Sequence, residues 1–317
     1  MYIKLILGGS GFVGRSVCDK LVERSGGAGG QIVVPSRRPA RVKYLQLLPT
    51  LRVVQADVHS ATELQRLVQG ADAVINLVAI LHGSTAEFER VHVELPRKLA
   101  EACNTAGVRR LVHVSALGVG DAAPSAYLRS KAAGEAVLKA AKLDLTILRP
   151  SVIFGEHDSF TNLFAALLTV APFVPLAGAH ARFQPVWVQD VAAAIVRCLD
   201  QPSSIGQTVE CAGPDVFTLQ QIVEQVGRWS GHERWVFGLP DAAARAQAFL
   251  MELMPGTPLM SRDNVDSMRV PNVAGGQLPG LASLGITASP MASVVPDYLS
   301  PGRGLARLDR WRARHGG

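Results

Sequence analysis

The sequence has little cysteine and no long apolar run. Four of its 317 residues are cysteines, and no two of them form a Cys-x-x-Cys pair. This scarcity argues against a disulfide framework or a zinc site and favours a reducing compartment. No stretch reaches the roughly 18 uninterrupted apolar residues that a membrane-spanning helix needs. Residues 1–7 form a short apolar run without a basic segment or a cleavage site, so we interpret them as a first strand and expect a cytoplasmic protein.

Charge is also scarce, and it is unevenly placed. Charged residues make up 18% of the chain and hydrophobic residues 48%, which excludes a disordered or fibrous protein. The net charge is +6, but residues 300–317 hold five arginines against one aspartate, a net charge of +4. The rest of the chain is nearly neutral, so we expect no nucleic-acid binding. The scattered histidines show no metal-ligand spacing; we interpret them as loop or surface residues and expect no metal: His82, His92, His113, His157, His180 and His232.

Short apolar runs alternate with helical segments over the first half of the chain. The expected strands are rich in leucine and β-branched residues: 3–7, 32–35, 51–55, 73–77, 110–115 and 145–148. The expected helices carry apolar residues at helical spacing: 11–25, 61–69, 89–106 and 127–141. This alternation predicts right-handed crossovers and an α/β fold, a doubly wound parallel sheet of the Rossmann type.

A glycine-rich turn directly follows the first expected strand, with the spacing Gly8-x-x-Gly11-x-x-Gly14. The first glycine permits a tight turn, the second lets the backbone approach a pyrophosphate, and the third lets the helix pack against the strand. The helix N-terminus then directs free N–H groups toward the phosphates. We therefore assign the turn to dinucleotide binding, in preference to an ordinary glycine-rich loop. The assignment includes the intervening residues Ser10, Phe12 and Val13.

The ends of the second and third expected strands bear on cofactor choice. An acidic residue after strand two would favour NAD, but Ser36, Arg37 and Arg38 stand there instead. A hydroxyl and two guanidinium groups suit a 2′-phosphate, so we predict NADP(H) in preference to NAD(H); the alternative is that both arginines are solvated loop charges. Asp57 and Val58 are placed to meet the adenine, although Asp57 would equally suit a helix cap.

Tyr127 and Lys131 are four residues apart at the start of a helical segment, which places them on one face. An ammonium group beside a phenol lowers the phenol pKa, so the tyrosine suits a general acid or base. The same ammonium can hold the nicotinamide ribose. Both residues follow the strand that ends at Ser115, which is either a hydrogen-bonding group of the site or a buried structural hydroxyl.

After about residue 150 the pattern loosens, and further elements are expected at 186–199, 208–211 and 219–229. We predict a dinucleotide-binding domain at 1–155 and about 186–202. A smaller, discontinuous C-terminal lobe for a substrate or partner follows at about 156–185 and 203–299, with a basic tail at 300–317.

The glycine turn, Ser115 and the Tyr127–Lys131 pair together resemble the short-chain dehydrogenase/reductase superfamily, in its extended or atypical branch. Residues 148–155 and 186–192 resemble two later segments of that branch. More narrowly, residues 36–39, 76–81 and 113–118 resemble the NAD(P)H-binding accessory-subunit family of respiratory complex I and its bacterial relatives.

The resemblance implies a cofactor role for further residues. Ala79 would lie against the cofactor, and Pro150, Val152 and Ile153 would line the nicotinamide site. The sequence departs from active extended members in one respect, because Ala116 and Leu117 stand where a second hydroxyl residue often follows the strand. This departure puts turnover in doubt and leaves the cofactor assignment intact.

Three functions follow. The first is an NAD(P)H-binding oxidoreductase acting on an apolar carbonyl or hydroxyl compound, or on a quinone-like compound. The second is a non-catalytic NADPH-binding structural or assembly factor related to the respiratory-complex subunit. The third, a nucleotide-sugar epimerase or dehydratase, fits less well because the segment 160–178 is strongly apolar.

The segment 160–178 and the basic tail also bear on partners. The segment is either a buried helix and loop or an apolar face for a substrate, a membrane or a respiratory-complex partner. The tail is either solvated or a basic amphipathic helix that suits an anionic surface. Peripheral contact with the inner face of the membrane is therefore a further hypothesis.

Overall fold

The computed structural model describes residues 3–27, 30–254, 256 and 258–300. The chain divides into two compact units. The first contains 1–150, 189–211 and 275–286, and the second contains 151–188, 212–274 and the chain from 287. The basic tail after Ser300 lies outside the described residues.

The first unit is built on a seven-stranded sheet, with the order β11-β6-β5-β4-β1-β2-β3 and parallel pairing throughout. Its strands are β1 (Ile3–Leu7), β2 (Gln31–Ser36), β3 (Leu51–Gln55), β4 (Ala73–Asn76), β5 (Arg110–Val114), β6 (Asp144–Pro150) and β11 (Thr208–Cys211). The central strand β4 is buried at all four positions, as expected of a strand covered on both faces. The predicted doubly wound Rossmann fold is confirmed.

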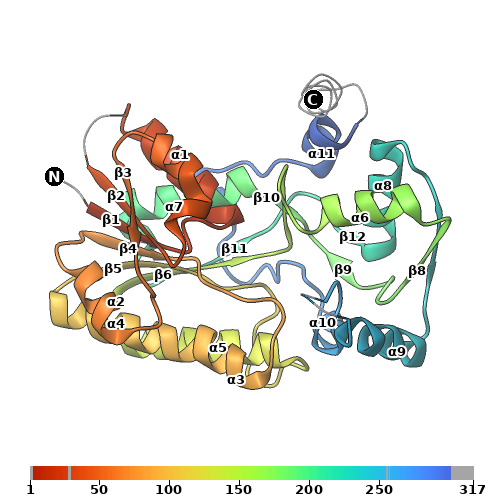
Figure 1. Cartoon of the computed structure of the whole chain (residues 1–317), viewed down its shortest axis with the longest axis horizontal. Helices are drawn as coiled ribbons and strands as arrows, with labels where there is room; N and C mark the ends of the chain where they lie inside the picture. Colours follow the sequence, from red (N-terminus) through yellow and green to blue (C-terminus); the bar gives the residue numbers. More distant parts are fainter. Residues whose placement is uncertain (1–2, 28–29, 255, 257, 301–317) are drawn as a thin grey trace. The chain divides into compact units, whose positions relative to one another are not determined.

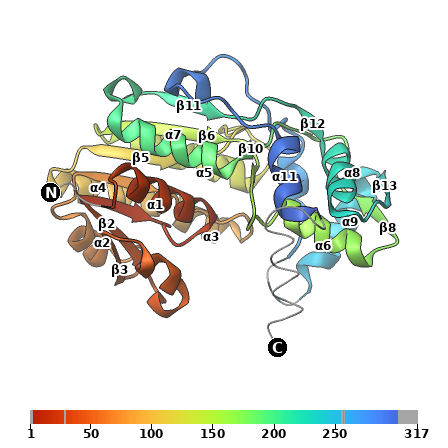
Figure 2. The ribbon, with the colours of Figure 1, turned by 90° about the horizontal axis from the view of Figure 1, so that it is seen from above.

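Helices cover both faces of this sheet. They are α1 (Phe12–Arg24), α2 (Ala61–Val68), α3 (Thr85–Glu89), the π-helix η2 (Arg90–Glu94), α4 (Leu95–Ala106), α5 (Ala126–Ala140) and α7 (Val188–Asp200), with short 3₁₀ helices η1 (Pro39–Leu47), η3 (Pro202–Ser204) and η4 (Leu281–Leu284). One layer contains α2, α4 and α5, and the other contains α1 and α7 (Figures 1 and 2). An ion pair between Arg24 and Asp200 and a hydrogen bond from Gln189 to Ser16 (3.1 Å) join α1 to α7.

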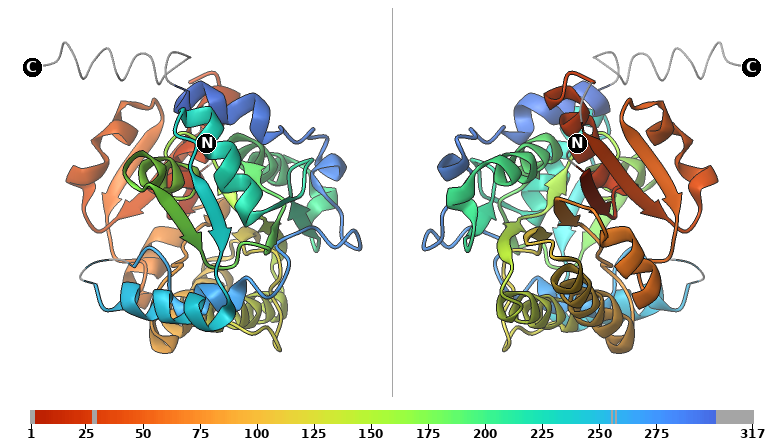
Figure 3. Two further views of the ribbon diagram at one scale, coloured as in Figure 1. Left: turned by 90° about the vertical axis from the view of Figure 1, so that its right-hand side faces the viewer. Right: turned by 90° about the vertical axis from the view of Figure 1, so that its left-hand side faces the viewer.

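The second unit has its own core. Its strands are β7 (Ile153–Phe154), β8 (Phe173–Leu176), β9 (Arg182–Phe183), β10 (Val186–Trp187), β12 (Phe217–Thr218) and β13 (Trp235–Gly238), and its helices are α6 (Thr161–Val170), α8 (Leu219–Ser230), α9 (Asp241–Glu252), α10 (Arg262–Ser267) and α11 (Met291–Leu299). Strands β8 and β13 pair in parallel, which Figure 3 shows in green and cyan on its left side. The apolar segment 160–178 forms α6 and β8, and Phe164, Leu168 and Val174 are buried in the core of this unit.

The structure differs from the sequence-based boundaries in several places, including residues 151–155, which belong to the second unit, and 275–286, which belong to the first. Strand β11 (Thr208–Cys211) is the edge strand of the large sheet, whereas we had placed 203–211 in the smaller lobe. The expected helix 89–106 is interrupted by the π-helix η2, which follows α3 and precedes α4. The spacing of apolar residues does not reveal a single π turn within a helical segment, because that turn lengthens the hydrogen-bonded spacing by only one residue.

Candidate functional site

The sequence-predicted cofactor residues of the first unit collect along one edge of its sheet. The glycine turn follows β1, the arginine pair follows β2, Asp57 and Val58 follow β3, and Ala79 follows β4. Because these strands are parallel, their carboxyl ends meet at the same edge. Strand β1 pairs with both β2 and β4, so the chain order reverses beside the glycine turn. Ligands of open α/β sheets bind at such a switch point.

The glycine turn is packed so tightly that side chains do not fit. Gly8 has φ +78°, a left-handed conformation that favours glycine. A Cβ on Gly14 would clash with the carbonyl oxygen of Gly8 and lie 2.5 Å from Cα of Gly9. The Gly11 N–H donates to the Gly8 carbonyl (2.9 Å), which closes the turn. The packing of this turn therefore explains why glycines stand at Gly8 and Gly14.

The N-terminus of α1 fits a phosphate group. Its N-cap is Gly11, which has no side chain to cap the first N–H groups, and the first turn contains no acidic residue. By contrast, Ser60 caps α2 and Ser125 caps α5 through their hydroxyl groups. The first-turn N–H groups of Phe12 and Val13 have no intrahelical acceptors, and the helix dipole adds positive potential there. The turn and helix thus match the pyrophosphate of a dinucleotide.

The ends of β2 and β3 lie side by side, since Ser36 pairs in register with Gln55. Arg37 and Arg38 are exposed, and the Arg38 N–H donates to the Ser36 hydroxyl (3.2 Å). Asp57 accepts a hydrogen bond from the His59 N–H (3.0 Å), so it forms a local turn. The cap of α2 is Ser60, which rules out the alternative that Asp57 is that cap.

The remaining predicted cofactor residues divide between the units. Ala79 is exposed just beyond β4. The preceding residue, Val78, lies close to the glycine turn, because a Cβ built on Gly8 would be 3.2 Å from the Val78 backbone nitrogen. Pro150 ends β6 in the first unit, and its carbonyl accepts from the Leu117 N–H (2.9 Å). Val152 and Ile153 belong to the second unit, where the Val152 N–H donates to the side chain of Asn272 (2.9 Å).

Tyr127 and Lys131 both lie on α5, but the pKa of Tyr127 shifts in the direction opposite to our expectation. Lys131 is 2% exposed, and its ammonium group donates to the Val114 carbonyl (2.9 Å). Burial lowers the pKa of Lys131 to about 8, against the opposing attraction of Glu135. Burial also raises the pKa of Tyr127 to about 12. The expected lowering by the neighbouring cation is therefore wrong, because desolvation of the phenolate outweighs it.

A buried carboxylate extends the same helix face by one turn. Glu135 is 2% exposed and receives two hydrogen bonds from the Arg149 guanidinium (2.8 and 2.6 Å). Burial opposes its ionisation, but the hydrogen bonds from Arg149 prevail and lower its pKa. Ser115 follows β5 and is 4% exposed. Among the described residues its buried hydroxyl oxygen makes no hydrogen bond.

Two histidines that we interpreted as loop or surface residues are core residues of this site. His92 and His113 are each 3% exposed. The Ile80 N–H donates to Nε2 of His92 (3.1 Å), so Nδ1 of its neutral ring is the donor to the Ser130 hydroxyl (2.9 Å), which in turn donates to the Tyr127 carbonyl (2.8 Å). Burial and the Lys131 charge lower the pKa of both histidines to about 3.

The ring of Tyr127 is held from two sides. The His92 ring packs edge-on at a centroid distance of 5.5 Å, and Phe88 packs edge-on at 6.0 Å. His92 lies in the π-helix η2, a type of turn that is frequent at functional sites. The sequence signal that would have revealed His92 is weak, because an isolated histidine in an apolar helix also suits an exposed face.

Arg15 and Tyr44 are two further residues that the sequence analysis missed. Arg15 immediately follows the third glycine of the turn, and its guanidinium lies 4.0 Å from the centroid of the Tyr44 ring. The Tyr44 hydroxyl donates to the carbonyl of Ser10 (3.0 Å). Within the described part of the chain, the buried Nε atom of Arg15 makes no hydrogen bond. A cation directly after the glycine motif is the signal that sequence inspection could have used.

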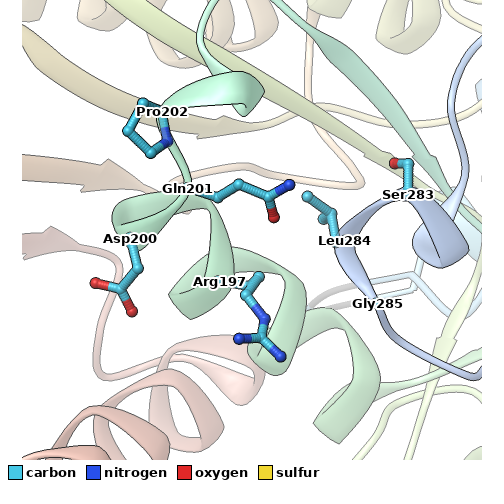
Figure 4. A pocket seen from close by; sticks show the side chains of 7 residues that line it. All are labelled: Arg197, Asp200, Gln201, Pro202, Ser283, Leu284 and Gly285. Atoms are coloured by element: carbon cyan, nitrogen blue, oxygen red, sulfur yellow. The ribbon is translucent and has the colours of Figure 1, made fainter.

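A separate groove lies on the first unit, away from these residues. It has a volume of about 450 Å³ and is lined by α7, the residues that follow it and η4: Arg197, Asp200, Gln201, Pro202, Ser283, Leu284 and Gly285 (Figure 4). None of the predicted site residues lines it. The described residues also contain no group of three or more metal-ligating side chains placed to hold an ion, and no helix among them is long and apolar enough to cross a membrane.

The fold and the carboxyl-edge site define a dinucleotide-binding Rossmann protein, and comparison with known proteins makes the assignment specific. A family model described as NAD(P)H-binding matches residues 8–202. The chain belongs to this NAD(P)H-binding family. The match begins at the first glycine of the turn and ends just after α7.

Relatives narrow the resemblance further. NADH dehydrogenase (ubiquinone) 1 alpha subcomplex subunit 9 of Mus musculus is 32% identical over 296 residues, covering 91% of this chain and 77% of that protein. The ceramide reductase of Caulobacter vibrioides is 29% identical over 237 residues, covering 74% of this chain and 73% of that protein. The predicted resemblance to the complex I accessory subunit and bacterial relatives is confirmed.

Among solved structures, the NADPH-dependent quinone oxidoreductase QOR2 of Escherichia coli, complexed with NADPH, superposes with a TM-score of 0.74. It is 22% identical and covers 92% of this chain and 97% of its own. The dTDP-glucose 4,6-dehydratase DesIV of Streptomyces venezuelae gives 0.72 at 22% identity, covering 99% of this chain and 97% of its own. These likenesses show that the chain shares its Rossmann-type fold with these two proteins.

Proposed function

We propose that this protein is an NADPH-dependent reductase of an apolar carbonyl compound. The observation that carries the proposal is the uncapped N-terminus of α1 behind a glycine turn with no room for side chains, beside a serine and two exposed arginines at the end of β2. This arrangement fits a dinucleotide whose adenosine half carries a 2′-phosphate.

The preference for NADP(H) rests on the end of β2. Arg37 and Arg38 offer guanidinium groups that suit bidentate phosphate contacts, and no acidic residue stands there to pair with a ribose hydroxyl. Both side chains are exposed, so a ligand can reach them from solvent. In this proposal, Asp57 and Val58 flank the adenine and Lys131 holds the nicotinamide ribose. An ammonium group has three donors, so its bond to the Val114 carbonyl leaves capacity for that contact.

The high pKa of Tyr127 bears on the direction of the reaction. A bound reduced nicotinamide supplies a hydride, which forms a C–H bond at the carbonyl carbon of the substrate. Tyr127 is protonated at neutral pH, since its ordinary pKa is about 10 and burial raises that pKa further, to about 12. It then gives its proton to the carbonyl oxygen as that oxygen gains the electron pair of the C=O bond, and it is reprotonated from solvent. A protonated phenol suits reduction better than oxidation, which needs a base.

The relatives support an apolar substrate. One is named a ceramide reductase, and a protein of the same fold is an NADPH-dependent quinone oxidoreductase. We extend the proposal to a long-chain lipid ketone as the substrate class, with the second unit as the substrate or partner lobe. The epimerase and dehydratase neighbours share the fold at 18–22% identity and add no argument for a sugar nucleotide.

The test uses purified full-length protein. NADPH and NADH affinities are measured by calorimetry, and NADPH oxidation is followed with a long-chain ketone and with a quinone. We expect Arg37→Ala to weaken NADPH binding about tenfold or more and NADH binding little. Tyr127→Phe should abolish oxidation of NADPH while leaving its affinity unchanged. Equal losses for both cofactors in Arg37→Ala would exclude the 2′-phosphate assignment.

A second candidate is a structural protein that binds NADPH without turnover. The curated complex I subunits support it, as does the absence of a second hydroxyl residue after Ser115, where Ala116 and Leu117 stand. In this case NADPH binds but stays unoxidised with every substrate, and Tyr127→Phe supports normal function in cells. A respiratory-complex partner would then co-purify with the tagged protein.

We further propose a peripheral location at the inner face of a membrane. In the second unit, Val170, Phe173 and Trp235 are 79%, 52% and 71% exposed. Exposed aromatic and aliphatic side chains of this kind suit a lipid interface. Cell fractionation that recovers the protein only in the cytoplasmic fraction would count against this location.

A further inference from the structure

Arg15 is a cation whose hydrogen-bonding capacity is left open at the mouth of the glycine turn. It is the fourth residue of α1, directly after Gly14. Side chains of a helix lean toward its N-terminus, so the guanidinium is carried back toward the turn. Among the described residues its buried Nε makes no hydrogen bond, and no carboxylate lies within ion-pair distance. A buried N–H without an acceptor costs free energy unless a ligand supplies one.

Tyr44 holds this guanidinium in a defined place. Its ring stacks under Arg15 at 4.0 Å, and its hydroxyl binds the Ser10 carbonyl at 3.0 Å. Tyr44 belongs to η1 (Pro39–Leu47), the segment that follows Arg37 and Arg38. The stack therefore joins the glycine turn to the connection after β2. It places the Arg15 guanidinium beside the connection that follows β2.

One nearby acid must be weighed against this arrangement. Asp19 lies one turn further along α1, and the Arg15 charge acts on it. Among the described residues, however, no ion pair or hydrogen bond joins Asp19 to Arg15, and Asp19 is exposed. The Arg15 guanidinium is therefore available to a second acceptor. An anion at the adenosine end of a dinucleotide is the acceptor that the position allows.

We propose that Arg15, held by Tyr44, is a specificity-determining residue that binds the 2′-phosphate of NADP(H) together with the arginine pair after β2. This inference rests on the proposed cofactor function. Arg15 supplies the terminal N–H groups of its guanidinium to the phosphate oxygens, and Tyr44 covers one face of the guanidinium. The aromatic ring shields the cation from water and strengthens the contact.

The test compares five variants by calorimetric titration with NADPH and with NADH. Arg15→Ala should weaken NADPH binding roughly ten- to hundredfold and NADH binding less than about threefold. Tyr44→Leu removes the ring and should reproduce most of this loss, whereas Tyr44→Phe keeps the stack and should lose less. Arg41→Ala, an exposed arginine of the same η1 segment, is the matched control for loss of one positive charge and should stay near wild type.

The outcomes separate this inference from the function on which it rests. If the wild-type protein binds neither dinucleotide, the proposed function is wrong. If it binds NADPH but Arg15→Ala behaves like Arg41→Ala, or loses both dinucleotides equally, the role of Arg15 at the 2′-phosphate is wrong while the cofactor function stands. Arg15→Lys keeps the positive charge but lacks the paired guanidinium donors, so it controls for misfolding of Arg15→Ala. An intermediate affinity of this variant for NADPH supports the proposal. Circular dichroism checks the fold of each variant.

Discussion

At the scale of single residues, the neutral rings of His92 and His113 lie beside the buried Lys131 cation. Burial first, and then the Lys131 charge, lowers the pKa of both histidines, so both rings stay neutral in the folded protein. Their hydrogen bonds depend on that neutrality: Nδ1 of His113 accepts from the Asn76 amide (3.1 Å), and Nε2 of His92 accepts from the Ile80 N–H (3.1 Å). Protonation would turn both acceptors into donors facing donors.

This arrangement predicts a loss of stability in mild acid. The pKa of His113 is about 3 in the folded protein against an ordinary value of 6.5, so below pH 6.5 the unfolded chain takes up a proton that the folded protein refuses. Its stabilising contribution is complete above pH 6.5 and is lost as pH falls, by about 1.4 kcal/mol per pH unit. In urea unfolding at pH 7, 6 and 5, His113→Asn should lose less stability with falling pH than wild type. His180→Asn, at an exposed position, should follow wild type; identical slopes for all three proteins would contradict the prediction.

At the scale of elements, the contact between α5 and the π-helix η2 positions the Tyr127–Lys131 pair. A Cβ on Gly134 of α5 would overlap the carbonyl oxygen of His92. The close approach is what brings the His92 ring to Ser130 and Tyr127. A glycine in mid-helix is unfavourable by about 1 kcal/mol relative to alanine, so its presence here reflects packing.

Gly134→Ala should therefore destabilise the protein by roughly 2–4 kcal/mol despite the better helix propensity of alanine. The measurement is the free energy of unfolding in urea. Gly120→Ala is the matched control, because a Cβ there meets no atom within 4 Å, and it should change stability little. Equal stability of the two variants would show that α5 and η2 can separate without loss.

At the scale of the whole molecule, apolar exposure is concentrated in the second unit while the first unit carries the cofactor site. The rings of Phe173, Trp235 and Phe237 form a group on β8 and β13, with centroid distances of 6.1 and 4.8 Å to Phe237. Such a patch needs a partner or an interface. Five arginines after residue 300 also give the part of the chain that follows α11 a positive charge.

The full-length protein should therefore co-sediment with vesicles of anionic phospholipid more than with neutral vesicles, and less at high salt. Phe173→Ser combined with Trp235→Ser should reduce the bound fraction several-fold without changing NADPH affinity. The control is Leu47→Ser, an exposed apolar residue of η1 in the first unit (85% exposed). Vesicle binding that is unaffected by the double substitution would exclude this patch as the contact.

The sequence by itself determined the sheet, the glycine turn and the family. Strands 3–7, 51–55 and 208–211 were predicted at their observed bounds, because short segments rich in leucine and β-branched residues between turn residues are typical of strands. The glycine spacing can be interpreted from the sequence because the backbone geometry of a single turn requires it. The family resemblance also rested on short motifs of this kind, and it was confirmed.

Only the tertiary structure decided the electrostatics and the partners of the site. His92, Glu135 and Arg15 come from different helices, and their roles depend on burial that no local pattern encodes. The same holds for Tyr127, whose high pKa results from desolvation by surrounding residues and not from its spacing to Lys131. Chain spacing shows which groups can meet, whereas the packing around them decides which of them can carry charge.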